Sequence, residues 1–385
     1  SLIRMRSQVR FLLAPPSVPL SARVRKRRPS EIHPPGHPCH FLGRHHCCRI
    51  AHQGQKPRGP FTGWVARGHS AEITAVSTSG DFNIGIVGSG VVGSRVALHL
   101  QSLGIRPRTT SFQHASELFD CSVVVLAHGA PHATLVSAFI AQGVSVVSAS
   151  DNLQDVMSIL DAHDRAVARG VSVIAGAACS PGMTGLLVHH VKRAFESIDE
   201  VHVAVHGTGG PACARQHHDS LAGVSIGWHD GEWLQRPAGS GRELCWFPDP
   251  IGARDCYRYG SPEPLLLQRA EITLQRITSR VSATRRDRLT ARLPMLAPPH
   301  PEGGIGGLRV EVRGVRNGNR HVEIVGVAER LASVAGAVAS NAALAIHNGT
   351  VPPGVHNLGQ ENLPNDTILD GVLATGTTLH QFVGN

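Results

Sequence analysis

The sequence predicts an α/β protein with two parts: a parallel β-sheet flanked by helices, and a second α+β domain whose sheet is largely antiparallel. Three observations support this prediction. A glycine-rich turn links a strand to a helix at residues 82–103, apolar strands alternate with helices over residues 122–175, and hairpin patterns appear after residue 200. The 385 residues are enough for two domains of ordinary size.

The glycine-rich turn opens the first part. Residues 82–87 form a short apolar strand, residues 88–93 read Gly-Ser-Gly-Val-Val-Gly, and residues 94–103 are expected to form a helix. A G-x-G-x-x-G sequence between a strand and a helix is the Rossmann dinucleotide-binding fingerprint, in which a pyrophosphate lies at the helix N-terminus. The alternative is a glycine-rich turn that binds no nucleotide. The expected cofactor contacts at this turn are Gly88, Ser89, Gly90, Val91, Val92 and Gly93.

Further strands of the same sheet follow. Residues 122–127, 144–149 and 171–175 are predicted as parallel strands because they are almost wholly apolar, and helices are expected at 133–142 and 153–169. Ligands of such sheets bind outside the carboxyl ends of the strands. The residues that we expect beside the cofactor or substrate are Ala127, His128, Gly129, Pro131, Ser150, Asp151 and Gly176.

The cofactor subtype depends on residues 105–111. A Rossmann domain that selects NAD usually has an acidic residue about twenty positions past the glycines, where it binds the ribose hydroxyls. This segment has no acidic residue, but it contains Arg106, Arg108 and three hydroxyl side chains. Arginines suit a 2′-phosphate, so the sequence favours NADP, with NAD as the alternative.

The second part has a different pattern. We expect a loop at 177–185, a helix at 186–195, a strand at 201–206, and hairpins about Asp230-Gly231 and Asn317-Gly318. An alanine-rich helix at 329–347 is expected to pack back on the first domain. The predicted divisions are a leader at 1–80, a Rossmann NAD(P)-binding domain at 81–178, a substrate domain at 179–328, and a C-terminal helix and tail at 329–385.

Residues 82–187 together resemble the saccharopine dehydrogenase family. The resemblance rests on the glycine turn, the strand and loop at 127–131, the strand that ends at Asp151, and the Pro181-Gly182 turn. It implies NAD(P)-linked chemistry at a C–N bond of an amino acid or imine. Some members that act on saccharopine have Asp before this turn and His three residues after its Gly, where this chain has Ser180 and Gly185. The specific substrate therefore stays open.

Candidate catalytic residues gather at 215–219. His217 and His218 have the intrinsic pKa for proton transfer near neutrality, and Arg215 could hold a substrate carboxylate. Asp151 is a third catalytic candidate, which could orient a base or contact ribose, or could cap the helix at 153. Cys179 and Ser180 are expected on the substrate side, although Cys179 could simply pack in the core. A non-catalytic NAD(P)-binding or ligand-sensing protein on the same fold is the alternative function.

Charge separates the leader from the body of the chain. Residues 1–80 hold 13 Arg and Lys against Glu31 and Glu72, whereas residues 81–385 hold 24 basic and 26 acidic side chains. The body therefore has no electrostatic signature of nucleic-acid binding. We expect the leader to be disordered or not native to the protein, because it is rich in Pro, Arg and His without a regular period. Translated upstream DNA and an organellar transit peptide starting at Met5 both remain open.

Other features of the sequence limit which partners and which cellular location we expect. No run of about 18 apolar residues occurs, so we expect no membrane span. Five scattered cysteines after residue 80 favour reduced thiols in a cytoplasm. The expected partner is a small-molecule substrate, without nucleic acid or membrane, and a homodimer is compatible with the sequence. No metal is expected in the body, and a leader site is disfavoured because no CxxC spacing accompanies His40, His45, His46, Cys47 and Cys48.

Overall fold

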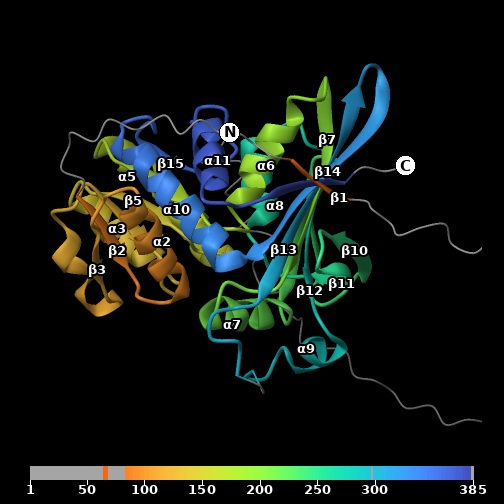
Figure 1. Cartoon of the computed structure of the whole chain (residues 1–385), viewed down its shortest axis with the longest axis horizontal. Coiled ribbons are helices and arrows are strands. Elements are labelled where there is room, and N and C mark those ends of the chain that lie inside the picture. Colours follow the sequence, from red (N-terminus) through yellow and green to blue (C-terminus); the bar gives the residue numbers. More distant parts are fainter. Residues whose placement is uncertain (1–63, 68–82, 296–297, 383–385) are drawn as a thin grey trace, which may run out of the picture. The chain divides into compact units, whose positions relative to one another are not determined.

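The computed structural model describes residues 64–67, 83–295 and 298–382, and within them the chain forms two β-sheets with flanking helices (Figure 1). One sheet is parallel and six-stranded, with the order β15-β6-β5-β4-β2-β3. The other has ten strands and is mixed, with β7 parallel to β12 and its remaining pairs antiparallel. This is an α/β Rossmann-like fold with a second domain, as the sequence predicts.

The parallel sheet forms because its strands are short apolar runs that can be buried on both faces. All residues of β2, β4 and β6 are buried. Its elements are β2 (Ile84–Val87), α2 (Val91–Ser102), β3 (Arg108–Thr110), η1 (Phe112–Leu118), β4 (Val123–Leu126), α3 (Ala133–Ala141), β5 (Ser145–Ser148), α4 (Leu153–Leu160), α5 (His163–Ala168) and β6 (Ser172–Ala175). The single helix expected over 153–169 is divided into α4 and α5, and α5 packs on the unpredicted strand β15.

The mixed sheet contains the two predicted hairpins. Asp230-Gly231 and Asn317-Gly318 all have positive φ angles, which a two-residue type I′ turn requires. The strands are β7 (Ser197–His206), β8 (Val224–His229), β9 (Glu232–Pro237), β10 (Glu243–Phe247), β11 (Gly252–Arg258), β12 (Arg276–Ser282), β13 (Ile305–Arg316) and β14 (Asn319–Arg330). The helices of this part are α6 (Met183–Lys192), α7 (Pro211–Ser220), α8 (Glu263–Ala270) and α9 (Arg285–Thr290).

The alanine-rich helix α10 (Leu331–His347) packs on α2 and also contacts strands of both sheets. Its small residues allow a close approach, since a Cβ atom on Gly336 would lie 2.6 Å from the Cβ of Arg95. One continuous cluster of buried apolar residues includes strands of both sheets and α10. The helix therefore lies against α2 and the parallel sheet.

The segment expected to be a tail is instead part of the fold. β15 (Gly354–His356) joins the edge of the parallel sheet beside β6, α11 (Asn365–Ala374) packs on α6 and α10, and β16 (Leu379–Phe382) pairs with β14. The strand β15 has only three residues and follows two prolines, so it shows no hydrophobic period. It could therefore not be predicted from the sequence.

The leader also departs from expectation at one place. β1 (Trp64–Arg67) pairs antiparallel with β16, so these four residues are not without secondary structure. The expectations for the rest of residues 1–80, including the candidate metal ligands at 40–48, lie outside the described residues. Within the part of the chain that is described, no helix combines the length and the apolar character that crossing a membrane needs.

Candidate functional site

A cleft of about 770 Å³ lies at the carboxyl edge of the parallel sheet, where the sequence predicts a ligand site. Four loops of the Rossmann part and helix α7 of the second part form its walls. The loops supply residues 88–92, 127–130, 149–151 and 178–180, and the segment around α7 supplies residues 209–213, Arg215, Gln216, His217 and Asp219. Pro131 and Gly176, which the sequence also placed here, do not line it.

The glycine turn has the shape that a dinucleotide cradle needs. Gly88 has a φ of +117°, a conformation that side chains rarely adopt. Gly93 lies beneath the turn rather than in the cleft, since a Cβ atom there would come within 1.9 Å of the Gly88 carbonyl oxygen. Gly90 precedes α2, and a Cβ atom at that position would have no neighbour within 4 Å. The open space at Gly90 therefore lies at the helix N-terminus, where backbone N–H groups can bind an anion.

A buried carboxylate that the sequence missed fixes the neighbouring loops. Asp155 accepts hydrogen bonds from the backbone N–H groups of His132 (2.8 Å) and Ala133 (2.9 Å), and from the Ser150 hydroxyl (2.6 Å). It thereby joins the loop after β4 to the loop after β5. One feature of the sequence could have identified Asp155: it is an acidic residue among the buried positions of α4, between Leu153 and Val156. Asn152, not Asp151, caps α4 by accepting from the Asp155 N–H (3.0 Å).

Two histidines follow β4. His132 is fully buried, and its ring contacts the Ser148 hydroxyl (2.8 Å) and the His128 carbonyl oxygen (2.9 Å); burial lowers its pKa to about 4. His128 lines the cleft, and burial lowers its pKa as well. The ring of His128 lies edge-on to the half-exposed ring of Phe112, with centroids 5.3 Å apart. Two rings therefore stand together near the carboxyl ends of β3 and β4.

The structure corrects the expectation for Arg106 and Arg108. Neither lines the cleft. Arg108 begins β3 rather than following it, and its guanidinium donates to both Asp120 carboxylate oxygens (2.7 and 2.8 Å) and to the Glu117 carbonyl. At the other end of β3, the Thr110 hydroxyl donates to the Glu117 carboxylate (3.2 Å). A carboxylate, and not an arginine, therefore lies beside the end of the strand where ribose is usually bound.

The central feature of the cleft is a cluster of Asp151, Cys213 and His217. Nε2 of His217 lies 3.6 Å from Oδ2 of Asp151 and 3.7 Å from Sγ of Cys213, and the sulfur lies 3.8 Å from the same carboxylate oxygen. Burial lowers the pKa of His217 to about 4, raises that of Asp151 to about 6, and raises that of the Cys213 thiol above its ordinary value. The sequence predicted Asp151 and His217 for this site but gave no reason to choose Cys213 among five body cysteines.

Helix α7 places only one of the two predicted histidines on the wall of the cleft. His217 lines the cleft, together with Arg215. His218 does not; its Nε2 lies 3.1 Å from the carbonyl oxygens of both Thr290 and Leu293, in a second cavity of about 540 Å³. His217 also lines this second cavity, so both histidines face it, but only His217 reaches the cleft as well. The structure therefore corrects the expectation that both histidines serve the same site.

Ser180 and Cys179 connect the cleft to another buried acid. Both line the cleft, and Cys179 is 5% exposed, with a pKa that burial raises to about 12. The hydroxyls of Ser180 and Thr184 donate to the two carboxylate oxygens of Glu263, the second at 2.5 Å. Glu263 is buried, and burial raises its pKa to about 7. No sequence motif marks Glu263, which lies 83 residues after Ser180.

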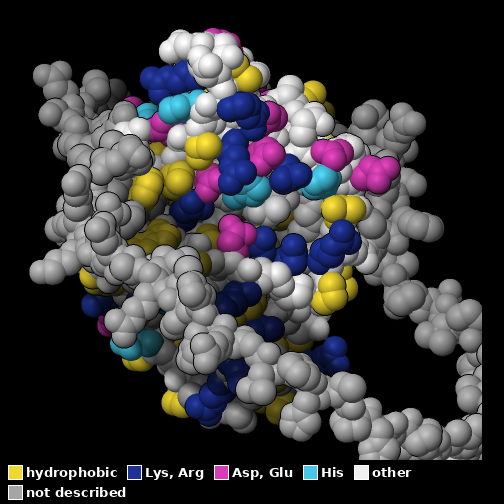
Figure 2. Space-filling view, turned by 90° about the vertical axis from the view of Figure 1, so that its right-hand side faces the viewer, with side chains coloured by type: hydrophobic (Ala, Val, Ile, Leu, Met, Phe, Trp, Pro, Cys, Tyr) yellow, Lys and Arg dark blue, Asp and Glu magenta, His cyan; other side chains and the backbone are white. Residues whose placement is uncertain are grey.

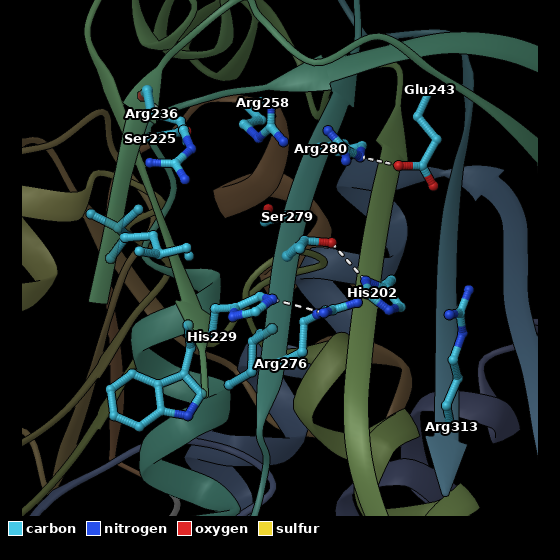
Figure 3. A pocket seen from close by; sticks show the side chains of 16 residues that line it. His202, Ser225, His229, Arg236, Glu243, Arg258, Arg276, Ser279, Arg280 and Arg313 are labelled. Atoms are coloured by element: carbon cyan, nitrogen blue, oxygen red, sulfur yellow. Dashed lines mark hydrogen bonds and ion pairs between the residues drawn. The ribbon is translucent and has the colours of Figure 1, made fainter. Parts of the chain in front are cut away.

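A separate cavity of about 590 Å³ lies on the mixed sheet and is rich in arginine (Figure 3). Arg280 pairs with Glu243 (2.6 Å), and Arg276 donates to His229 (2.7 Å). None of its residues lines the main cleft. Basic and acidic side chains are interspersed on the face of the molecule in Figure 2. This cavity lacks a glycine turn, so the main cleft is the candidate functional site.

Comparison with known proteins extends the description of the fold. No known protein family matches the sequence, and no curated protein matches it. Among solved structures, saccharopine dehydrogenase (L-Glu forming) from Saccharomyces cerevisiae is similar, with a TM-score of 0.57 and 14% identity over 78% of this chain and 100% of that one. The C. glutamicum DAP dehydrogenase has a TM-score of 0.44 and 13% identity over 76% of this chain and 98% of that one. At such identities the first likeness supports the Rossmann-like, two-part fold.

Proposed function

We propose that the protein is an NAD(P)-dependent oxidoreductase of the saccharopine dehydrogenase type, acting on an amino-acid-like or imine substrate. One observation carries the proposal: residues 88–92 of the glycine turn and the Asp151–Cys213–His217 cluster lie on the walls of the same cleft. A nucleotide cradle that opens onto reactive side chains is the arrangement of a dehydrogenase. The likeness to a saccharopine dehydrogenase is an analogy of fold, and the residues of the cleft carry the functional argument.

The residues of the cleft fit a dinucleotide. The open space at Gly90 would receive the pyrophosphate at the N-terminus of α2, and the rings of Phe112 and His128 would lie beside the adenosine end. A nicotinamide bound in this cleft supplies or accepts a hydride. The Glu117 carboxylate near Thr110 would accept a hydrogen bond from a ribose hydroxyl and repel a 2′-phosphate, so we propose NAD in preference to NADP.

Arg215 is our candidate for binding the substrate. Its side chain is exposed on the wall of the cleft, and it forms no ion pair with any residue that the structure describes. A guanidinium can hold a carboxylate through two parallel hydrogen bonds. Asp151 and His217 stand within the same cleft, where a proton must be supplied or removed when a C–N bond is reduced or oxidised.

Turnover assays test this proposal. Purified protein would be mixed with NADH or NADPH and a panel of 2-oxo acids with amines, and with NAD⁺ or NADP⁺ and a panel of amino acids, while nicotinamide absorbance is followed. We expect oxidation of NADH in the presence of at least one 2-oxo acid and amine pair. The absence of any substrate-dependent change in either direction, by protein that binds the cofactor, would reject the enzymatic proposal.

A non-catalytic NAD(P)-binding or ligand-sensing protein is the second candidate, and one observation favours it. A Cβ atom at Gly185 would lie 2.2 Å from the Leu358 carbonyl oxygen, so no histidine could occupy this position. The chain therefore lacks a residue that the resemblance associates with saccharopine chemistry. This second candidate predicts cofactor binding without turnover.

A further inference from the structure

We propose that Asp151, Cys213 and His217 form a binding site for a zinc-class divalent cation on the wall of the cleft. The site would take an ion that accepts mixed sulfur, nitrogen and oxygen ligands. This inference goes beyond the oxidoreductase proposal and does not depend on it. An ion bound here would occupy the atoms of Asp151 and His217 to which that proposal gives proton transfer, so ion binding is tested separately from turnover.

The spacing of the three ligand atoms carries the inference. The nitrogen, sulfur and carboxylate oxygen are separated pairwise by 3.6, 3.7 and 3.8 Å. A tetrahedral zinc ion with Zn–S of about 2.3 Å and Zn–N and Zn–O of about 2.1 Å keeps such ligand atoms roughly 3.4–3.6 Å apart. The three atoms therefore already form nearly one face of a zinc tetrahedron, and a shift of a few tenths of an ångström would complete it.

A hydrogen-bonded catalytic triad explains this arrangement less well. The distance from His217 Nε2 to Asp151 Oδ2 exceeds the range of an N–H···O hydrogen bond. In a thiol–imidazole–carboxylate relay, the thiol and the acid bind opposite nitrogens of the ring. Here both approach Nε2, while Nδ1 has no hydrogen-bond partner among the described residues. Convergence of three atoms on one point is typical of ligands around an ion.

The electrostatics of the cluster also favour a cation. Within the described part of the chain, no Lys or Arg lies within ion-pair distance of Asp151. The carboxylate side chain is 22% exposed, so water compensates its charge only in part. A divalent ion would balance one carboxylate and one thiolate, which leaves the group neutral.

Rigid elements present the three ligands. Cys213 and His217 are four residues apart on α7, which places them on the same face of that helix. Asp151 directly precedes Asn152, the residue that caps α4. Three protein ligands leave the fourth position for water or a small ligand, and because all three line the cleft, that ligand can enter from it.

Cobalt(II) titration tests the site, since tetrahedral Co²⁺ bound to a thiolate has visible d–d bands and a near-ultraviolet charge-transfer band. The full chain would be used with Cys39, Cys47 and Cys48 replaced by serine, because the leader also contains Cys and His. We expect one Co²⁺ per chain, displacement by Zn²⁺, and a rise in Tm with Zn²⁺. Failure to bind Co²⁺ or Zn²⁺ would overturn the proposal, whatever the result of the turnover assays.

Matched variants assign the ligands. Cys213→Ser should remove the charge-transfer band, and His217→Gln should weaken Co²⁺ binding by about 100-fold. Cys179→Ser and His218→Gln change the same residue types nearby, outside the cluster, and should leave the spectrum and the affinity unchanged. Loss of the band in Cys179→Ser with retention in Cys213→Ser, or unchanged affinity in His217→Gln, would contradict the assignment. Circular dichroism of each variant verifies that it is folded.

Discussion

The backbones of Gly88 and Gly93 are in direct contact, since a Cβ atom on Gly93 would lie 1.9 Å from the Gly88 carbonyl oxygen. The first and last glycines of the turn therefore shape the protein itself. Gly90 differs, because a Cβ atom there would have no neighbour within 4 Å. The three glycines thus separate into two that the fold requires and one whose empty space is available to a ligand.

Substitution at these glycines should separate stability from binding. Gly93→Ala should lower the free energy of unfolding by about 2–4 kcal/mol, because the methyl group must push α2 away from the turn. Gly90→Ala should lower it by only about 0.5–1 kcal/mol, the difference between Gly and Ala at a helix N-cap, since the backbone there is extended and the space is open. Urea denaturation measures both. Wild-type stability of Gly93→Ala would show that the contact is not rigid.

Glu263 should make stability depend on pH. Its pKa is raised to about 7 in the folded protein from an ordinary 4.5, because the carboxyl is buried. A raised carboxyl pKa means that the folded state holds the proton more tightly, so its contribution to stability is present below about pH 4.5 and is lost as the pH rises through 7. That loss should approach about 3 kcal/mol.

Urea denaturation at pH 5 and pH 8 measures this effect. Glu263→Gln should reduce the difference between the two pH values, because the amide cannot ionise. Its oxygen can still accept from one of the two hydroxyls of Ser180 and Thr184, and its N–H can donate to the other. Glu232→Gln, at an exposed position, should leave the difference as in the wild type. An equal pH dependence in all three proteins would mean that Glu263 does not titrate in this range.

Asp155 should be a large contributor to stability. Asp155→Ala would leave the buried N–H of His132 and that of Ala133 without their acceptor, and should lower the free energy of unfolding by about 3 kcal/mol. Asp164→Ala, which removes an exposed acid from the first turn of α5, should cost less than about 1 kcal/mol. Similar losses in the two variants, by chemical denaturation, would exclude a special role for Asp155.

Arg215 should act on substrate and not on cofactor, if the oxidoreductase proposal holds. Arg215→Ala should raise KM for a carboxylate substrate by about 100-fold, because one charge-assisted bidentate contact is lost. Its NADH affinity and its Tm should match the wild type. Arg286→Ala removes an exposed arginine that does not line the cleft and should leave KM unchanged. An unchanged KM in Arg215→Ala would show that another residue binds the substrate carboxylate.

Local sequence patterns were sufficient for much of the fold. The strand, glycine turn and helix at 84–102 follow from apolar runs and from the backbone freedom of glycine, and both hairpins follow from Asp-Gly and Asn-Gly pairs. Asp151 was a candidate because it follows a predicted strand, and His217 because of the chemistry of its side chain; both line the cleft. Local patterns did not reveal β15, because three residues are too few to show a period.

Side chains that act through long-range contacts could not be predicted. Glu263 reaches Ser180 across 83 residues, and Cys213 reaches Asp151 across 62. Glu117 comes beside Thr110 only because η1 folds back after β3. Local sequence also led to a wrong expectation for Arg108. Its charge suggested that it binds the 2′-phosphate of the cofactor, but its guanidinium pairs with Asp120. The sequence shows which ionisable side chains the chain contains, but only the tertiary structure shows which partner each of them has.

Binding of reduced nicotinamide cofactor is the most direct test of the claim that this cleft is a dinucleotide site. Fluorescence titration would compare NADH and NADPH with the wild type, Gly90→Ala and Gly223→Ala, the last being a glycine with equally open space outside the cleft. We predict saturable binding to the wild type and to Gly223→Ala, tighter for NADH, and at least about 100-fold weaker binding to Gly90→Ala. No binding of either cofactor to the wild type, or equal affinity in Gly90→Ala, would contradict the claim.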